Sequence, residues 1–185
     1  AMLARCEVIV AGVDGGGLDD LLGLALVGRE SGSGRWLLWS HAWASPAVFM
    51  RRKDIADRLR DFERAGDLSI CEPGRDVQEV ADVIERVEAS GLLDRIGVDA
   101  SGIGAIVDAV VSRGIDDERI VAVPQGWRLV GAIKTLERKL AASEVAHGSI
   151  PLMAWCVGNA RPEPRGNAVI ITKQVAGSAK IDPLM

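Results

Sequence analysis

Three aspartates in this sequence stand where a carboxylate site could be built. Asp14 follows the apolar run Cys6–Val13, Asp99 follows a second apolar run in the segment 96–102 (IGVDASG), and Asp182 lies in the segment KIDPLM. If the two runs are neighbouring parallel strands, Asp14 and Asp99 leave them at one sheet edge, where side chains distant in sequence converge. Clustered carboxylates repel one another unless a cation neutralises them, and their hard oxygen atoms select Mg²⁺ or Mn²⁺.

Such a cluster is suited to phosphodiester hydrolysis. Two divalent ions about 4 Å apart can activate a water molecule and stabilise the leaving oxygen of an in-line displacement. The alternative is that each aspartate caps a helix or shapes a turn, which is the commonest role of Asp beside Gly. Asp19 and Asp20 fit that alternative, because the GGGLDD loop needs polar turn residues in any case. The residues alone leave both interpretations open.

The composition is typical of a globular protein with a single core. With 185 residues, 48% of them hydrophobic and 26% charged, we expect one domain spanning the whole sequence. No apolar run approaches the roughly 20 residues that cross a bilayer, and no signal segment is evident, so we expect a cytosolic protein without a membrane partner. Cys6, Cys71 and Cys156 are odd in number and far apart, which disfavours a disulfide framework or a zinc site. The formal net charge of −4 weighs mildly against a nucleic-acid partner.

Hydrophobic periodicity predicts a mixed α/β sheet flanked by helices. Three antiparallel strands are expected at Cys6–Val13, Leu21–Arg29 and Arg35–Trp43. A surface helix is expected from Pro46 to Ala65. Parallel strands then alternate with helices, which gives strands Leu68–Cys71, Arg95–Asp99 and Arg119–Val123 and helices Asp76–Ser90, Ile103–Ser112 and Leu129–Ser143. The last expected elements are a helix at Ile150–Val157, a hairpin at Arg161–Gln174 and the first turn of a helix at Lys180–Met185.

This order of elements resembles the RNase H-like superfamily. Six segments make the resemblance more specific: Gln125–Gly126, LERKL at 136–140, HGSIPLMAWCVGN at 147–159, Gly166–Asn167, Lys173, and KIDP at 180–183. In that order and spacing they resemble the nuclease half of large terminase subunits from HK97-like tailed bacteriophages. The segment VDGGGLDDLLGLAL resembles the first metal motif of that family. The resemblance covers nearly the whole chain, from about Val8 onward.

The resemblance implies an RNase H-like endonuclease that cuts concatemeric phage DNA during genome packaging, in the cytoplasm of the host cell. It implies that Asp14, Asp99 and Asp182 are catalytic and hold two divalent cations, Mg²⁺ or Mn²⁺, and that Asp20 is an additional metal ligand. The implied partners are double-stranded DNA, the terminase ATPase domain, the small terminase subunit and the portal protein.

The sequence departs from the family pattern in two respects. Large terminases carry an ATPase domain ahead of the nuclease, and no G-x-x-x-x-G-K-[ST] loop occurs here. The family also continues past K-I-D into a longer final helix. We therefore expect a single nuclease domain at 1–185, without the ATPase domain and with a truncated final helix.

The basic and aromatic residues carry further expectations. Lys173 and Lys180 flank the proposed site in sequence and are the predicted DNA contacts, while most other basic residues are expected on solvated helix faces. His147, beside Gly148, is expected to make local hydrogen bonds rather than to act in catalysis. Trp155 and the other tryptophans are expected to pack in the core or on the surface.

Two alternatives belong to other functional classes. The first is an actin-like sugar kinase or ATPase, because AGVDGGG and DASGIG resemble the two phosphate loops of that superfamily. Those enzymes usually need two subdomains and well over 185 residues, and they have no place for Asp182. The second is a catalytically inactive RNase H-like assembly module, which would be expected to have lost the carboxylates.

Overall fold

The structure is a computed structural model that describes residues 2–99, 104–166, 168–173 and 180–185. Its strands are β1 (Cys6–Gly15), β2 (Leu22–Glu30), β3 (Trp36–Ala44), β4 (Leu68–Ile70), β5 (Leu93–Val98), β6 (Ile120–Ala122), β7 (Val145–Ala146), β8 (Ala160–Arg165) and β9 (Ala168–Lys173). Its α-helices are α1 (Ala47–Arg51), α2 (Ala56–Ala65), α3 (Arg75–Ala89), α4 (Gly104–Val111), α5 (Val130–Ala141) and α6 (Pro151–Asn159). Short 3₁₀ turns are η1 (Asp117–Arg119), η2 (Gly126–Leu129) and η3 (Asp182–Leu184).

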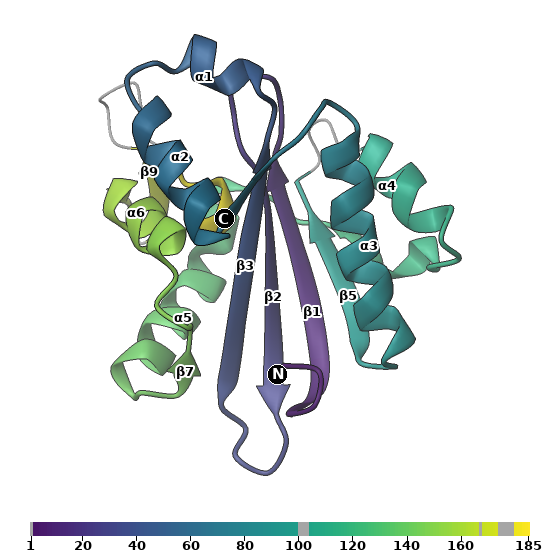
Figure 1. Ribbon diagram of the computed structural model, residues 1–185. Helices are drawn as coiled ribbons and strands as arrows, with labels where there is room; N and C mark the ends of the chain where they lie inside the picture. The colour runs from purple at the N-terminus through teal and green to yellow at the C-terminus, as the bar shows by residue number, and fades with distance from the viewer. Residues whose placement is uncertain (1, 100–103, 167, 174–179) are drawn as a thin grey trace.

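A mixed sheet forms the centre of the molecule (Figure 1), with strand order β4-β3-β2-β1-β5-β6. The strands β1, β2 and β3 form an antiparallel meander, while β4 runs parallel to β3, β5 to β1 and β6 to β5. The two-residue strand β7 also pairs with β3 in parallel. The predicted meander followed by parallel strands and helices is confirmed.

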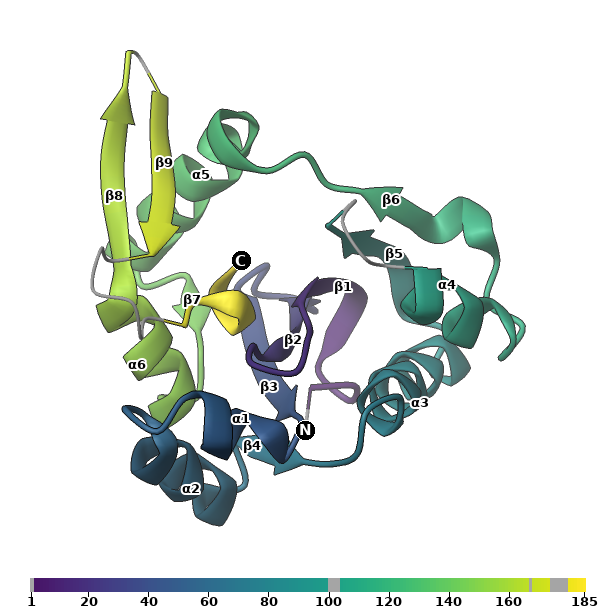
Figure 2. The same ribbon diagram turned by 90° about the horizontal axis from the view of Figure 1, so that it is seen from above.

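One face of β1 and β5 is covered by α3 and α4, which lie together beside β5 in both views (Figures 1 and 2). The alternation of β1 explains this burial, because Ile9, Ala11 and Val13 are buried whereas Val10 and Gly12 between them are exposed. The buried face meets the apolar stripe of α3, which includes the fully buried Val80 and Ile84. Because α3 and α4 cover this face of β1 and β5, side chains on the other face of these two strands do not pack against α3 and α4.

A second apolar cluster joins α1, α2 and α6 to β3, β4 and the start of β2. Leu59 and Phe62 of α2 meet Leu152 and Cys156 of α6 in this cluster. The antiparallel pair β8 and β9 follows α6 and projects from the sheet (Figure 2). None of the helices in the described ranges is long and apolar enough to cross a membrane.

The predicted single helix from Pro46 to Ala65 is wrong. Two helices, α1 and α2, occupy the segment, and the chain leaves helical geometry at Arg52, where φ is −122° and ψ is 59°. Periodicity could not detect this break, because Val48, Ile55 and Leu59 keep helical spacing across it and no Gly or Pro marks it. Within the predicted later elements, Ile103, Asn167 and Gln174 lie outside the described residues.

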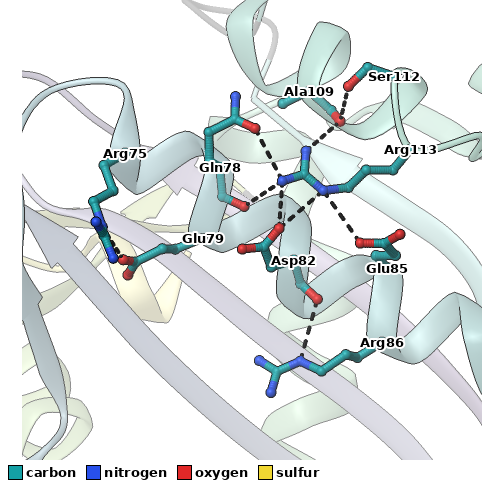
Figure 3. A network of polar contacts seen from close by, with 9 residues as sticks. All are labelled: Arg75, Gln78, Glu79, Asp82, Glu85, Arg86, Ala109, Ser112 and Arg113. Atoms are coloured by element: carbon teal, nitrogen blue, oxygen red, sulfur yellow. Dashed lines mark hydrogen bonds and ion pairs between the residues drawn. The ribbon is translucent and has the colours of Figure 1, made fainter.

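Arg113, just after α4, ties that helix to α3 (Figure 3). Its guanidinium donates to the Ala109 carbonyl at 2.9 Å, to the Gln78 carbonyl at 3.1 Å and to the Asp82 carboxylate at 2.5 Å. Glu85 lies 3.6 Å from the same group, and the Arg113 side chain is only 15% exposed. The planar guanidinium can serve several acceptors at once, so it joins the two helices that cover the sheet.

Candidate active site

Asp14 lies near the end of β1 and Asp99 directly follows the neighbouring parallel strand β5, and both face the same side of the sheet. Val13 of β1 is in register with Val98 of β5, and the Asp99 amide donates to the Val13 carbonyl at 3.4 Å. Both valines are buried against the helical layer. Because successive side chains alternate between the two faces of a strand, the aspartates that follow the valines face the opposite side. The two strand ends are therefore neighbours at one edge of the sheet, while the role of the two aspartates as site residues stays a prediction.

The turn between β1 and β2 begins at Gly15, and the absence of a side chain there leaves space for Asp182. Gly15 has φ +86°, a backbone conformation that L side chains rarely adopt. A Cβ atom there would lie 2.2 Å from the Leu21 carbonyl oxygen and 3.0 Å from Cβ of Asp182. Only glycine fits this position, because any side chain would clash with both the turn and the C-terminal segment.

Asp182 reaches the site because η3 rests directly on the sheet. Gly23 is the β2 partner of Asp14, and a Cβ atom on Gly23 would lie 2.7 Å from the Pro183 nitrogen. The segment before η3 is held by Asn159 of α6, whose amide donates to the Lys180 carbonyl at 3.0 Å. Asp182 is buried, at 5% exposure. Residues from opposite ends of the sequence thus meet over Gly15 and Gly23.

Lys180 does not occupy the position expected of a DNA contact. It is only 4% exposed, and its ammonium donates at 2.7 Å both to the Asp19 carbonyl and to the Asp20 carboxylate. This burial weighs against the predicted role of Lys180 in DNA binding, because the charge is directed to the Asp19–Asp20 loop and not to solvent. That role stays a prediction. Asp20 also accepts a hydrogen bond from the Leu21 amide at 3.0 Å. Its carboxylate therefore helps to hold the loop, whereas the expected role of Asp20 was that of a metal ligand.

An open pocket of about 570 Å³ brings four carboxylates to one place. Asp14, Asp20, Asp99 and Asp182 all line it. The remaining lining residues come from the glycine turn, from the loop after β6, from β9 and from the C-terminal segment: Gly15, Gly16, Gln125, Ile171, Thr172, Ile181 and Met185. The oxygen donors in this wall are of the kind that hard divalent cations prefer.

Carboxylate oxygens are suitable ligands for a divalent cation, but the four side chains are too far apart to bind one ion together. Among the described residues, no three His, Cys, Asp or Glu side chains are grouped tightly enough to hold a single ion. Like charges that share a pocket repel one another, which favours a spread arrangement when no cation is present.

Gln125 and Thr172 line the pocket but were not predicted to be site residues. Gln125 follows β6, the parallel strand beside β5, so the strand-end argument that selected Asp99 also applies to it. Thr172 lies in the hairpin, whose approach to the sheet no local pattern predicts. Lys173 is the last residue of β9, next to Thr172, and its role as a DNA contact stays a prediction.

His147 and Trp155 lie outside the pocket wall. The His147 ring accepts a hydrogen bond from the Ser149 amide at 3.4 Å, as expected of a local hydrogen-bonding residue. Trp155 packs on Phe62 with the ring centroids 5.5 Å apart, as expected of a packing residue. Cys156, also on α6, is buried near the site, where desolvation and then the Asp182 carboxylate raise the pKa of its thiol to about 12.

The sequence matches no protein-family model and no curated protein. Solved structures do match. The crystal structure of the HK97 bacteriophage large terminase superposes with a TM-score of 0.77 at 20% identity, over 96% of this chain and 37% of that chain. The large terminase nuclease from thermophilic phage G20c gives a TM-score of 0.59 at 13% identity, and its magnesium-bound structure gives 0.57 at 15%. Each covers 96% of this chain and 77% of the G20c chain.

This chain has the fold of the phage terminase nucleases. The predicted RNase H-like class is thereby confirmed, with its antiparallel meander, its parallel extension and its flanking helices. The terminase-nuclease fold accounts for nearly the whole chain, whereas the chain spans little more than a third of the HK97 large terminase.

Proposed function

We propose that this chain is a metal-dependent endonuclease that cuts concatemeric phage DNA during genome packaging. The observation that carries the proposal is the pocket lined by Asp14, Asp20, Asp99 and Asp182. Fold alone does not imply function, so the terminase-nuclease fold supports the proposal only together with this carboxylate set. The magnesium in the G20c nuclease structure adds support for a divalent cation.

Asp14, Asp99 and Asp182 are the proposed ligands of two divalent cations, Mg²⁺ or Mn²⁺, with Asp20 as an additional ligand. Such ions, when bound, activate a water molecule and stabilise the leaving oxygen of the phosphodiester. The two strands and η3 position the three carboxylates, while Lys180 holds Asp20 in the arrangement described here. Binding of a cation offsets the repulsion among the carboxylates and so favours their closer approach.

The proposed substrate contacts include Gln125, which lines the pocket. Its amide is a neutral donor that can bind a phosphate oxygen without adding to the acidic charge. Thr172 lines the pocket too, but its hydroxyl already donates to the Glu163 carboxylate at 3.0 Å. Lys173, which follows Thr172, is the proposed charged contact to the DNA backbone. No base-reading element is required by this arrangement, so we expect cleavage without strong sequence preference.

The proposed setting is the packaging machinery in the host cytoplasm. A terminase ATPase domain, the small terminase subunit and the portal protein are the proposed partners, with double-stranded DNA as substrate. The chain spans 37% of the HK97 large terminase, which supports the proposal that it acts as a nuclease domain beside a separate ATPase domain.

The decisive experiment is plasmid cleavage by the purified protein with Mn²⁺ or Mg²⁺, run beside an assay for ATP hydrolysis on the same sample. We expect nicked and linear products without sequence preference, complete inhibition by EDTA, and no ATP turnover. Equal cleavage in excess chelator contradicts the metal mechanism. ATP turnover without cleavage supports the actin-like alternative. The absence of both activities supports an inactive assembly module.

A further inference from the structure

We propose that Trp127 and Arg128 form a stacking site for an unpaired DNA base at the rim of the carboxylate pocket. This inference rests on the proposed nuclease function and adds the form of DNA that the site accepts. All five tryptophans lie within the described residues, and Trp127 is the exposed one, with 63% of its surface accessible. Trp43 is buried, and Trp36, Trp39 and Trp155 are half-buried.

The position of Trp127 links it to the pocket. Gln125 lines the pocket and is followed by η2, in which Trp127 lies. Two residues of chain span at most about 7 Å, which corresponds to roughly two base steps along a DNA strand at about 3.4 Å per step. The η2 turn also contacts β9, whose Ile171 and Thr172 line the same pocket. The inference is that a strand bound in the pocket extends past Gln125 to η2, where one of its bases stacks on the indole.

The chemistry of the pair suits a nucleic-acid base. The Arg128 guanidinium carbon lies 5.4 Å from the centre of the Trp127 ring, close enough for a cation–π interaction. Arg128 is itself exposed, so it adds a positive charge at the rim of an acidic pocket. Aromatic side chains reinforced by arginine are a general means of binding single strands, because every base presents a π-face.

An exposed apolar side chain standing alone requires no explanation. Trp127 differs in having an arginine over its ring and a pocket-lining residue two positions away. Bases inside a duplex are already stacked on both faces, so the indole can accept only a base at a strand end or in an unpaired stretch. The pair thus favours frayed, nicked or locally opened DNA over intact duplex.

The inference is tested by binding of a short oligothymidylate in EDTA, where the proposed metal-dependent cleavage cannot proceed. The variants are Trp127→Ala, Trp127→Phe and, as a control, Met50→Ala, which removes an equally exposed apolar side chain at 72% exposure. The readouts are the dissociation constant, measured with a labelled strand, and quenching of the intrinsic tryptophan fluorescence.

We expect the wild type to bind with quenching. Trp127→Ala should bind at least about fivefold more weakly, the lower limit of the effect of losing one base–aromatic stack. Trp127→Phe should keep most of the affinity but lose the quenching, and Met50→Ala should match the wild type. The preference for the single strand over a blunt duplex of the same length should shrink in Trp127→Ala.

Two outcomes overturn the inference: wild-type binding that is absent or leaves the fluorescence unchanged, or Trp127→Ala binding with wild-type affinity. Failure of the proposed nuclease function is a separate result, namely a wild type that does not cleave plasmid with Mn²⁺. A protein that cleaves but shows no effect at Trp127 refutes the stacking site alone.

Discussion

At the scale of single residues, the pocket is lined by four aspartates whose like charges repel one another. Asp14 and Asp99 could be selected from the sequence because each follows an apolar run, and the ends of neighbouring parallel strands converge at one edge of a sheet. Asp182 could be selected only by its family resemblance, because no spacing predicts that η3 returns to Gly15 and Gly23. The burial of Lys180 was missed for the same reason, since a surface lysine and a buried one look alike in sequence.

We expect Asp99→Asn to abolish metal-dependent cleavage while preserving the fold. Asn keeps the size of the side chain but removes one of several crowded negative charges, so the variant should melt at the same or a higher temperature in metal-free buffer. With Mn²⁺ the order should reverse, because a ligand present at about 100 times its dissociation constant stabilises the native wild type by about 2.7 kcal/mol. Melting curves with and without Mn²⁺, beside the plasmid assay, measure both effects.

Asp94→Asn is the matched control for Asp99→Asn, because Asp94 lies exposed on β5, the strand that Asp99 directly follows. It should keep full cleavage and the metal-dependent rise in melting temperature. If Asp99 were only a structural cap, its variant would instead lose about 0.5–2 kcal/mol in both buffers without any crossover. Cleavage retained by Asp99→Asn would remove this residue from the site.

At the scale of elements, the third carboxylate depends on how closely η3 approaches the sheet. We expect Gly23→Ala to weaken metal-dependent cleavage, because the added Cβ would lie 2.7 Å from the Pro183 nitrogen and 2.8 Å from the Asp182 carbonyl carbon. The clash should displace η3 and cost about 1–3 kcal/mol, as overpacking typically does. The Mn²⁺ concentration for half-maximal cleavage should rise, and a titration of the metal measures this shift.

Gly12→Ala serves as the control for Gly23→Ala. Gly12 lies on the adjacent strand β1, and a Cβ atom there meets nothing within 4 Å. The Gly12→Ala variant should have a metal titration and a melting temperature close to those of the wild type. An unchanged metal titration in Gly23→Ala would show that the site does not depend on the seating of η3.

The contact between α3 and α4 gives a second prediction for an element. Arg113→Met keeps the aliphatic stem but leaves the Ala109 and Gln78 carbonyls without their guanidinium donor, and we expect a loss of about 1–3 kcal/mol in the free energy of unfolding. Arg86→Met removes an exposed guanidinium bonded only within α3, at 3.4 Å from the Asp82 carbonyl, and should change stability by less than about 0.5 kcal/mol. Figure 3 shows both arginines, and urea denaturation of the two variants compares their effects on stability directly.

At the scale of the whole molecule, the antiparallel meander and the parallel strands that follow it were predictable, because strands and helices of different period alternate clearly along the chain. The break between α1 and α2 was not, since apolar spacing continues across it. The two-residue strand β7 is too short to give any periodic signal, and its pairing with β3 depends on where α5 ends. The sequence did not predict where β7, the hairpin and η3 lie relative to the rest of the molecule.

The three thiols should report on global unfolding. Burial raises the pKa of Cys6 and Cys71, and the pKa of Cys156 is raised to about 12, so little thiolate forms near pH 8. We expect a thiol reagent to modify the half-buried Cys71 first, and to reach Cys6 and Cys156 only across the unfolding transition in urea. Because thiolate is the reactive form, raising the pH should speed the reaction of Cys71 well before that of Cys156.

A Cys71→Ser variant identifies the fast reaction, which should disappear while the two slow thiols remain. Modification of Cys156 in the native protein at the rate of Cys71 would contradict the burial of α6 against η3. Mass spectrometry of the modified peptides assigns each rate to its cysteine.

The bond between Lys180 and the Asp19 carbonyl joins residues 161 positions apart, and Asp182 lies just beyond it. On a translating ribosome, the strands that carry Asp14 and Asp99 are made long before the segment that completes the pocket. A nascent chain can thus form its sheet while the carboxylate pocket is still missing one wall. The order of synthesis would delay the proposed nuclease activity until the C-terminal segment has emerged and folded back onto the earliest strands.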